Sequence, residues 1–129
     1  MIDWLRKLGI RREAPLTGAP PVRRLKTYSA NTGYVYQYFY AGHRGGEYVF
    51  QASHDRRNYF PVSVVLAAGT VESFERDRAR GLNSTEQYAV AKLALFQAFD
   101  ERRRPDDLRE AVLIRRADLD LIADQLGFI

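Results

Sequence analysis

The chain has no cysteine, and it has only one tryptophan, one methionine and two histidines among its 129 residues. Without cysteine it can form no disulfide framework, thiolate metal site or cysteine nucleophile. No apolar run approaches the ~18 residues that a membrane-spanning helix needs. The first eight residues carry charges where an export signal would be apolar. These absences predict a cytoplasmic protein, and the small size and simple organisation favour a bacterial one.

The composition is that of one globular domain, with 46% hydrophobic and 28% charged residues. Basic residues outnumber acidic ones by 20 to 16, and 17 of the 20 are arginine. The excess lies in residues 1–64, which carry a net charge of +6, whereas residues 65–129 carry −2. Because the arginine side chain forms forked contacts with carboxylates and phosphates, this bias favours binding of anions.

Residues 1–24 are predicted to form a unit of their own, a short amphipathic helix followed by a proline-rich linker. Apolar side chains recur every three residues from Ile2, and Gly9 can end the helix. Two helical turns are unstable alone in water, so the helix must dock on a surface. The residues predicted to make that contact are Trp4, Leu5 and Leu8.

Residues 25–129 are predicted to form a single α+β domain that begins with strands. Stretches rich in aromatic and β-branched residues alternate with short polar turns, which is typical of an antiparallel meander. Pro61 lacks a backbone donor, so its strand is expected to lie at an edge or to bulge there. The expected strands are residues 34–40, 47–53 and 59–66, and a leading strand over 25–29 is an option.

The second half is predicted to be helical. A helix is expected over residues 70–80, ended by Gly81, and a second one from Ser84, where Ser84 and Gln87 have the spacing of a capping box. Because this second helix is apolar nearly all round, it is expected to lie buried on the sheet. Residues 111–115 can add a short strand, and Gly127 closes a last helix. The predicted fold is therefore an antiparallel meander sheet of three to five strands followed by helices, with one apolar central helix packed on the sheet.

Aromatic residues concentrate in the strand region, which holds seven of the eight tyrosines. In residues 34–40 the tyrosines alternate with other residues, so they share one face of the strand. We expect the faces with Gln37 and Gln51 to point to solvent and the tyrosine face to meet the central helix. The functional alternative is an aromatic and basic binding surface, whose candidate residues are Arg44, Arg56, Arg57, His43, His54, Tyr36, Tyr38 and Tyr48.

No catalytic residue, metal site or cofactor is predicted. The two histidines flank a strand of seven residues, roughly 23 Å long, so they cannot share a metal ion. The glycine-rich turn Gly42–Gly46 precedes a strand and lacks the lysine of a phosphate-binding loop. A helix-turn-helix is excluded because the second helix offers almost no polar residues to base edges.

The pattern as a whole favours a non-enzymatic interaction module that uses the aromatic and basic sheet region. A protein partner or self-association is the expected binding event, and nucleic acid is a second option because the sequence pI is near 9.6. Two alternatives stay open. One is a small-molecule-binding or catalytic protein with a pocket between sheet and helix, marked by tyrosine hydroxyls, arginine and histidine that converge. The other is a structural homo-oligomer.

Overall fold

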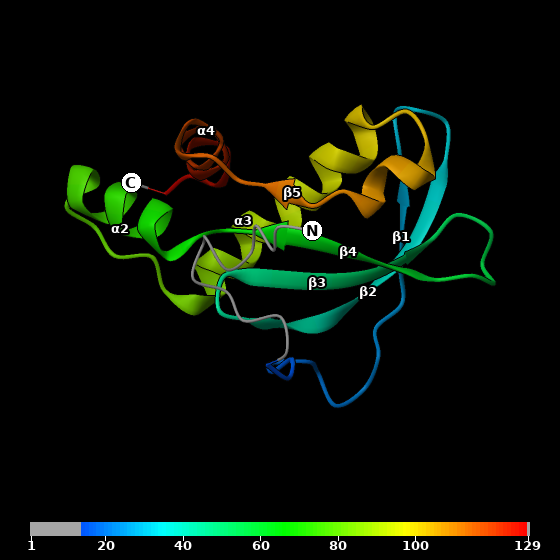
Figure 1. The fold of residues 1–129 in the computed structure, drawn as a ribbon. Coiled ribbons are helices and arrows are strands. Elements are labelled where there is room, and N and C mark those ends of the chain that lie inside the picture. Colours follow the sequence, from blue (N-terminus) through cyan, green and yellow to red (C-terminus); the bar gives the residue numbers. More distant parts are fainter. Residues whose placement is uncertain (1–13, 129) are drawn as a thin grey trace, which may run out of the picture.

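The computed structural model describes residues 14–128. Strands come first and helices follow, so the α+β prediction is confirmed (Figure 1). The elements are β1 (Lys26–Ser29), β2 (Val35–Arg44), β3 (Glu47–Ser53), β4 (Phe60–Val65), α2 (Ala68–Arg78), α3 (Ser84–Glu101), the 3-10 helix η1 (Pro105–Arg109), β5 (Val112–Leu113) and α4 (Arg116–Leu126).

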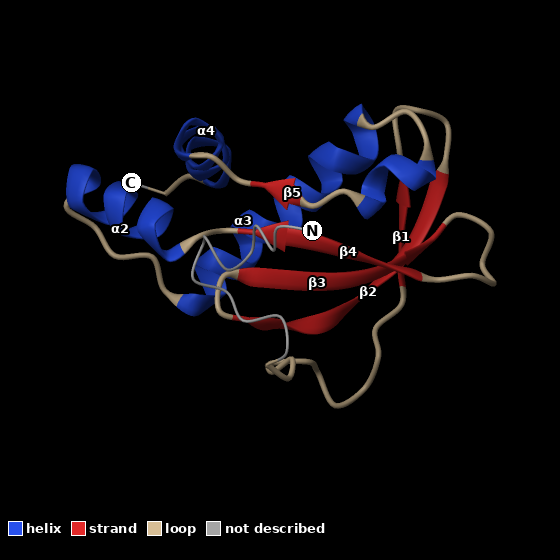
Figure 2. Cartoon of the chain, viewed as in Figure 1, coloured by secondary structure: helices blue, strands red, loops and turns tan. Residues whose placement is uncertain are grey.

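The five strands form one curled sheet in the order β1-β2-β3-β4-β5 (Figure 2). The first four are antiparallel neighbours, as a meander predicts, whereas β5 is parallel to β4. This parallel pairing follows from the connection, because α2 and α3 carry the chain back before it re-enters the sheet. β5 pairs only with Val64 and Val65, so the Pro61 end of β4 has β3 as its one neighbouring strand among residues 14–128.

Strand β2 is longer than predicted because it contains a bulge. The turn was expected over residues 41–46, but it consists of Gly45 and Gly46 alone, and the strand continues to Arg44. The pairing register shifts between Tyr40 and Gly42, where one extra residue is inserted against β3. The bulge turns His43 to the same side of the sheet as its partner Tyr48, with which it stacks at 5.5 Å between ring centroids.

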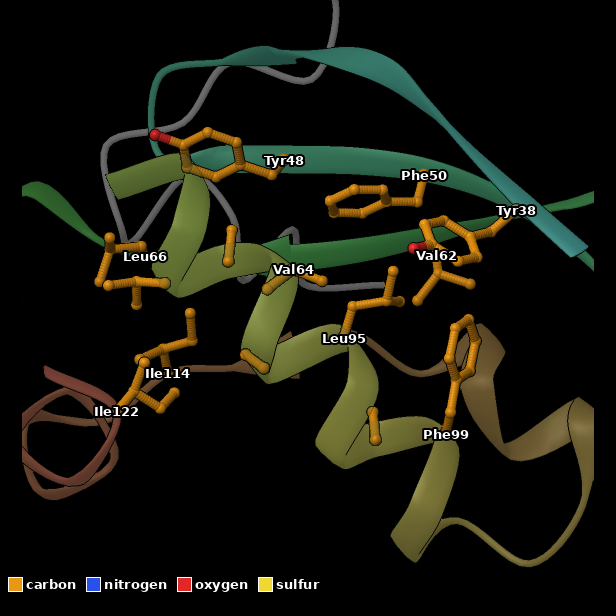
Figure 3. Packing of buried hydrophobic residues seen from close by; sticks show 14 of the residues in the cluster. Tyr38, Tyr48, Phe50, Val62, Val64, Leu66, Leu95, Phe99, Ile114 and Ile122 are labelled. Carbon is orange, nitrogen blue, oxygen red and sulfur yellow. The ribbon is translucent and has the colours of Figure 1, made fainter. Parts of the chain in front are cut away.

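The tyrosine face of the sheet meets α3, as expected from the alternation. Tyr36 is fully buried and stacks on Phe99 with ring centroids 4.4 Å apart. Figure 3 shows Phe50 of β3 and Val62 of β4 on the side of the sheet that faces Leu95 and Phe99 of the helix. These contacts form the main hydrophobic core of the domain.

Helix α3 begins at Ser84, but its cap lies one residue earlier than predicted. The Asn83 side chain accepts a hydrogen bond from the Glu86 backbone amide at 2.8 Å, and Glu86 Oε1 accepts one from the Asn83 amide at 3.1 Å. The capping box is therefore Asn83–Glu86, not Ser84–Gln87. The side chain of Gln87 donates instead to the carbonyl of Leu82.

Helices α2 and α4 lie against each other beside β5 (Figure 1). Ion pairs join them, with Arg116 Nη1 2.7 Å from Asp77 Oδ2 and Arg78 Nη2 3.1 Å from Asp120 Oδ1. α2 was predicted to end at Gly81, but Ala79 ends it in the left-handed conformation with φ 51°. The predicted closure of α4 by Gly127 is confirmed, with φ 76°.

The described part of the predicted linker lies against the sheet. Thr17 and His43 exchange two backbone hydrogen bonds of 2.8 Å, so residues before β1 pair with the end of β2. The predicted docking residues Trp4, Leu5 and Leu8 lie outside the described residues. Within residues 14–128, no helix combines the length and the apolar character needed to cross a membrane.

Candidate functional site

The predicted tyrosine surface is mostly the interior of the fold. Tyr36 is 0% and Tyr38 5% exposed, and both rings contact Phe99 of α3. Burial raises the pKa of Tyr36 to about 12. Because their rings fill the core, these two residues stabilise the fold and present little surface to a partner.

The three predicted arginines do not gather on one surface. Arg44 Nε lies 2.7 Å from Glu47 Oε1, and its Nη1 donates to the carbonyl of Ala14 at 3.0 Å. Arg56 and Arg57 lie at the other end of β3, exposed in the turn to β4. Asp55 fixes that turn by accepting hydrogen bonds from the backbone amides of Arg57 and Asn58, each at 2.8 Å.

The two histidines lie at opposite ends of β3. His54 is exposed and packs its edge against Tyr34, with centroids 5.8 Å apart. His43 stacks on Tyr48 at the hairpin end. Of the predicted site residues, the structure therefore brings His43 and Tyr48 together, and both line a cleft.

This cleft has a volume of about 610 Å³ and is bounded by three parts of the chain. The segment before β1 forms one wall, the first turns of α3 form another, and the hairpin end of β2 and β3 forms the floor. Its lining residues are Gly18, Pro20, Arg24, Lys26, Tyr40, His43, Gly45, Tyr48, Ser84, Thr85, Gln87, Tyr88 and Lys92.

The floor of the cleft is aromatic. The Tyr40 ring packs against Tyr88 at 4.8 Å and Tyr48 at 6.5 Å between centroids. Burial raises the pKa of all three tyrosine hydroxyls above the ordinary value. They therefore keep their protons at neutral pH and can donate hydrogen bonds to a bound molecule.

The charged residues that line the cleft are all basic. Arg24, Lys26 and Lys92 contribute positive charge, and no aspartate or glutamate is among the lining residues. Within residues 14–128, neither lysine forms an ion pair with a carboxylate. Burial, followed by the neighbouring Lys26 ammonium group, lowers the pKa of Lys92. Two like charges placed side by side cost free energy that a bound anion would recover.

The glycine at position 18 allows the segment before β1 to pack closely against His43 of β2. Its φ is +80°, and a Cβ there would lie 2.9 Å from His43 Cδ2 and 3.1 Å from His43 Nε2. The other ring nitrogen, His43 Nδ1, is buried with no hydrogen-bond partner in the described part of the chain. The close packing of Gly18 thus sets the position of the imidazole at the edge of the cleft.

Of the thirteen residues that line this cleft, the sequence predicted only His43 and Tyr48 as site residues, and it missed all three basic ones, Arg24, Lys26 and Lys92. One signal for two of them was present in the composition. The chain has three lysines among 20 basic residues, at positions 7, 26 and 92, and two of the three meet here. Apart from Lys7, every other basic residue of the chain is an arginine.

A second, smaller groove of about 480 Å³ lies on the face of the sheet that points away from α3. The guanidinium carbon of Arg23 sits 4.7 Å from the centroid of the Phe39 ring, a cation–π contact. Leu25 and Tyr59 beside it are 52% and 36% exposed. The lining residues are Arg23, Leu25, Phe39, Ala41, Gln51 and Tyr59.

Among residues 14–128, no group of three or more histidine, aspartate or glutamate side chains is arranged to hold a metal ion. Comparisons of the chain with family models, with curated proteins and with solved structures gave no match.

Proposed function

We propose that this protein binds a small organic anion in the cleft between the sheet and α3, without catalysing a reaction. The observation that carries the proposal is the juxtaposition of Lys26 and Lys92 beside an aromatic floor with no acidic lining residue. An anion between the two ammonium groups would relieve their repulsion and form charge-assisted hydrogen bonds. The proposal concerns a cytoplasmic protein, as the cysteine-free composition favours.

The rest of the ligand is expected to be flat and partly apolar. The cleft volume of about 610 Å³ lies within the range of about 300–1,000 Å³ that small-molecule sites occupy. Tyr40 and Tyr88 are partly buried and offer ring surface for packing and hydroxyl groups for hydrogen bonds, whereas Tyr48 is 6% exposed and packs against Tyr40. This combination supports a molecule with an anionic end and a ring system, rather than a bare inorganic ion.

The fluorescent aromatic sulfonate 1-anilinonaphthalene-8-sulfonate tests the proposal, since it joins one negative charge to apolar rings. Replacing Lys92 by methionine should weaken its binding about tenfold at low salt, because a hydrogen bond to a charged group is lost. Lys26→Met should have a similar effect. The measurement is a fluorescence titration with the native fold checked by circular dichroism.

The matched control is Arg76→Met, which removes one exposed positive charge from α2, away from the cleft lining. It should leave the affinity unchanged. Equal affinities for Arg76→Met and Lys92→Met would contradict the proposal, because only nonspecific attraction would then hold the probe.

The groove on the other face of the sheet favours a second candidate function, self-association of the chain. The partly exposed apolar side chains of Leu25 and Tyr59 lie beside the Arg23–Phe39 pair, a combination common in protein interfaces. Leu25→Glu should shift the protein toward monomer in sedimentation velocity. The control Leu121→Glu, on the exposed face of α4, should not.

A wild-type protein that is monomeric at all concentrations would contradict self-association. Salt-sensitive binding of single-stranded RNA that Leu25→Glu abolishes would favour nucleic acid instead.

A further inference from the structure

We infer that the anionic group held between Lys26 and Lys92 is a phosphate monoester. This inference rests on the proposed function and names the chemical class of its ligand. The bound group has to pair with two neighbouring ammonium groups, that of Lys26 from β1 and that of Lys92 from α3.

The first argument is the balance of charge. A carboxylate or sulfonate carries one negative charge and would leave the lysine pair with a net positive charge. A phosphate monoester carries about −1.5 to −2 at pH 7 and has three acceptor oxygens. One dianion can therefore neutralise both lysines and still accept a hydrogen bond from Arg24 or a tyrosine hydroxyl on the cleft lining.

The second argument is the choice of lysine. The planar fork of arginine pairs with carboxylates and phosphates alike, and arginine provides 17 of the 20 basic residues of this chain. At the centre of the basic cluster the chain instead has two lysines, whose compact ammonium groups act as point charges. Lysine is a common phosphate ligand in this role.

The other ionisable residues that line the cleft come from several elements. They are Arg24 from the segment before β1, His43 and Tyr40 from β2, Tyr48 from β3, and Tyr88 from α3. A change of pH between 5 and 8 alters the charge of the phosphate itself, whose second pKa is about 6.

The test compares two probes of the same shape, phenyl phosphate and benzenesulfonate, by titration calorimetry with the whole chain. At pH 7.5 phenyl phosphate should bind about tenfold more tightly, because it carries the second negative charge. At pH 5 the phosphate is a monoanion, since its second pKa is about 6, and the preference should disappear. A change of charge on the protein alters the affinity for both probes, so the ratio of the two affinities isolates the charge of the phosphate.

The variants Lys26→Met and Lys92→Met should each reduce the ratio at pH 7.5 to about one, whereas Arg76→Met should retain it. Amide spectra of each variant establish that it is folded. Equal affinities of the wild type for the two probes at pH 7.5 would overturn the phosphate inference and leave the anion cleft standing. Failure of both probes and of the fluorescent sulfonate to bind would overturn the anion cleft as well.

Discussion

Replacing Leu95 by alanine should lower the free energy of unfolding by about 2–5 kcal/mol. Leu95 is 0% exposed and lies midway along α3, where its side chain points toward Val62 and Val64 of β4 (Figure 3). The substitution removes buried apolar surface and leaves a cavity that the close-packed core can refill only in part. Because small domains are stable by about 5–15 kcal/mol, this loss is a large fraction of the total. Urea denaturation followed by circular dichroism measures it.

The matched control is the same substitution on the surface. Leu121 lies on α4 and is 63% exposed, so Leu121→Ala should change the unfolding free energy by less than about 0.5 kcal/mol. Both variants replace leucine by alanine within a helix, so the change in helix propensity is the same. The difference between their unfolding free energies therefore reports the effect of burial. A Leu95→Ala variant that unfolds at the same urea concentration as Leu121→Ala would show that α3 is not the core helix of the domain.

The position of α3 in the core could be predicted because its sequence leaves few polar residues on any side. A helix apolar nearly all round has no face for water, so it must be covered by the sheet and by other helices. The orientation of the tyrosines followed from a related constraint. One face of the sheet has to pack against the core helix, and tyrosines such as Tyr36 and Tyr38 can bury their rings on that face.

The ends of the elements were harder to predict because several residues competed for each role. Asn83, Ser84 and Thr85 can all cap a helix, and the structure selects Asn83 because Glu86 reciprocates its hydrogen bond. The sequence does not identify the bulge in β2, because a glycine such as Gly42 is equally compatible with a turn. The parallel pairing of β5 depends on the packing of α2 and α3, which no local pattern specifies.

The cleft could not be predicted because its walls come from parts of the chain far apart in sequence. Arg24 ends the predicted linker and Lys26 follows it, whereas Tyr88 and Lys92 belong to a helix that was interpreted as apolar nearly all round. The backbone pairing of Thr17 with His43 turns the linker into a wall, and this pairing involves no side-chain pattern. His43 and Tyr48 were identified from composition, but the composition gave no indication that they face one another.

The substitution Gly46→Ala should also destabilise the fold, by about 1–3 kcal/mol, through overpacking of backbone against backbone. A Cβ on Gly46 would lie 2.1 Å from the Leu66 carbonyl oxygen and 2.9 Å from its carbon. The chain segments are held at this distance by the hydrogen bond from the Leu66 amide to the Gly46 carbonyl, 2.8 Å long. The added methyl group would force them apart and weaken that bond, where β4 ends and α2 begins.

The control for this prediction is Gly69→Ala in the first turn of α2. A Cβ on Gly69 meets no atom within 4 Å, and its φ is not in the left-handed region. Alanine there should be neutral or should stabilise the protein by up to about 1 kcal/mol, because glycine is the weaker helix former. In thermal melts, the melting temperature of Gly46→Ala should therefore be lower than that of the wild type. The melting temperature of Gly69→Ala should be equal to or higher than that of the wild type. An unchanged melting temperature for Gly46→Ala would mean that the hairpin end and the start of α2 separate at little cost, and that this contact does not fix the helix relative to the sheet.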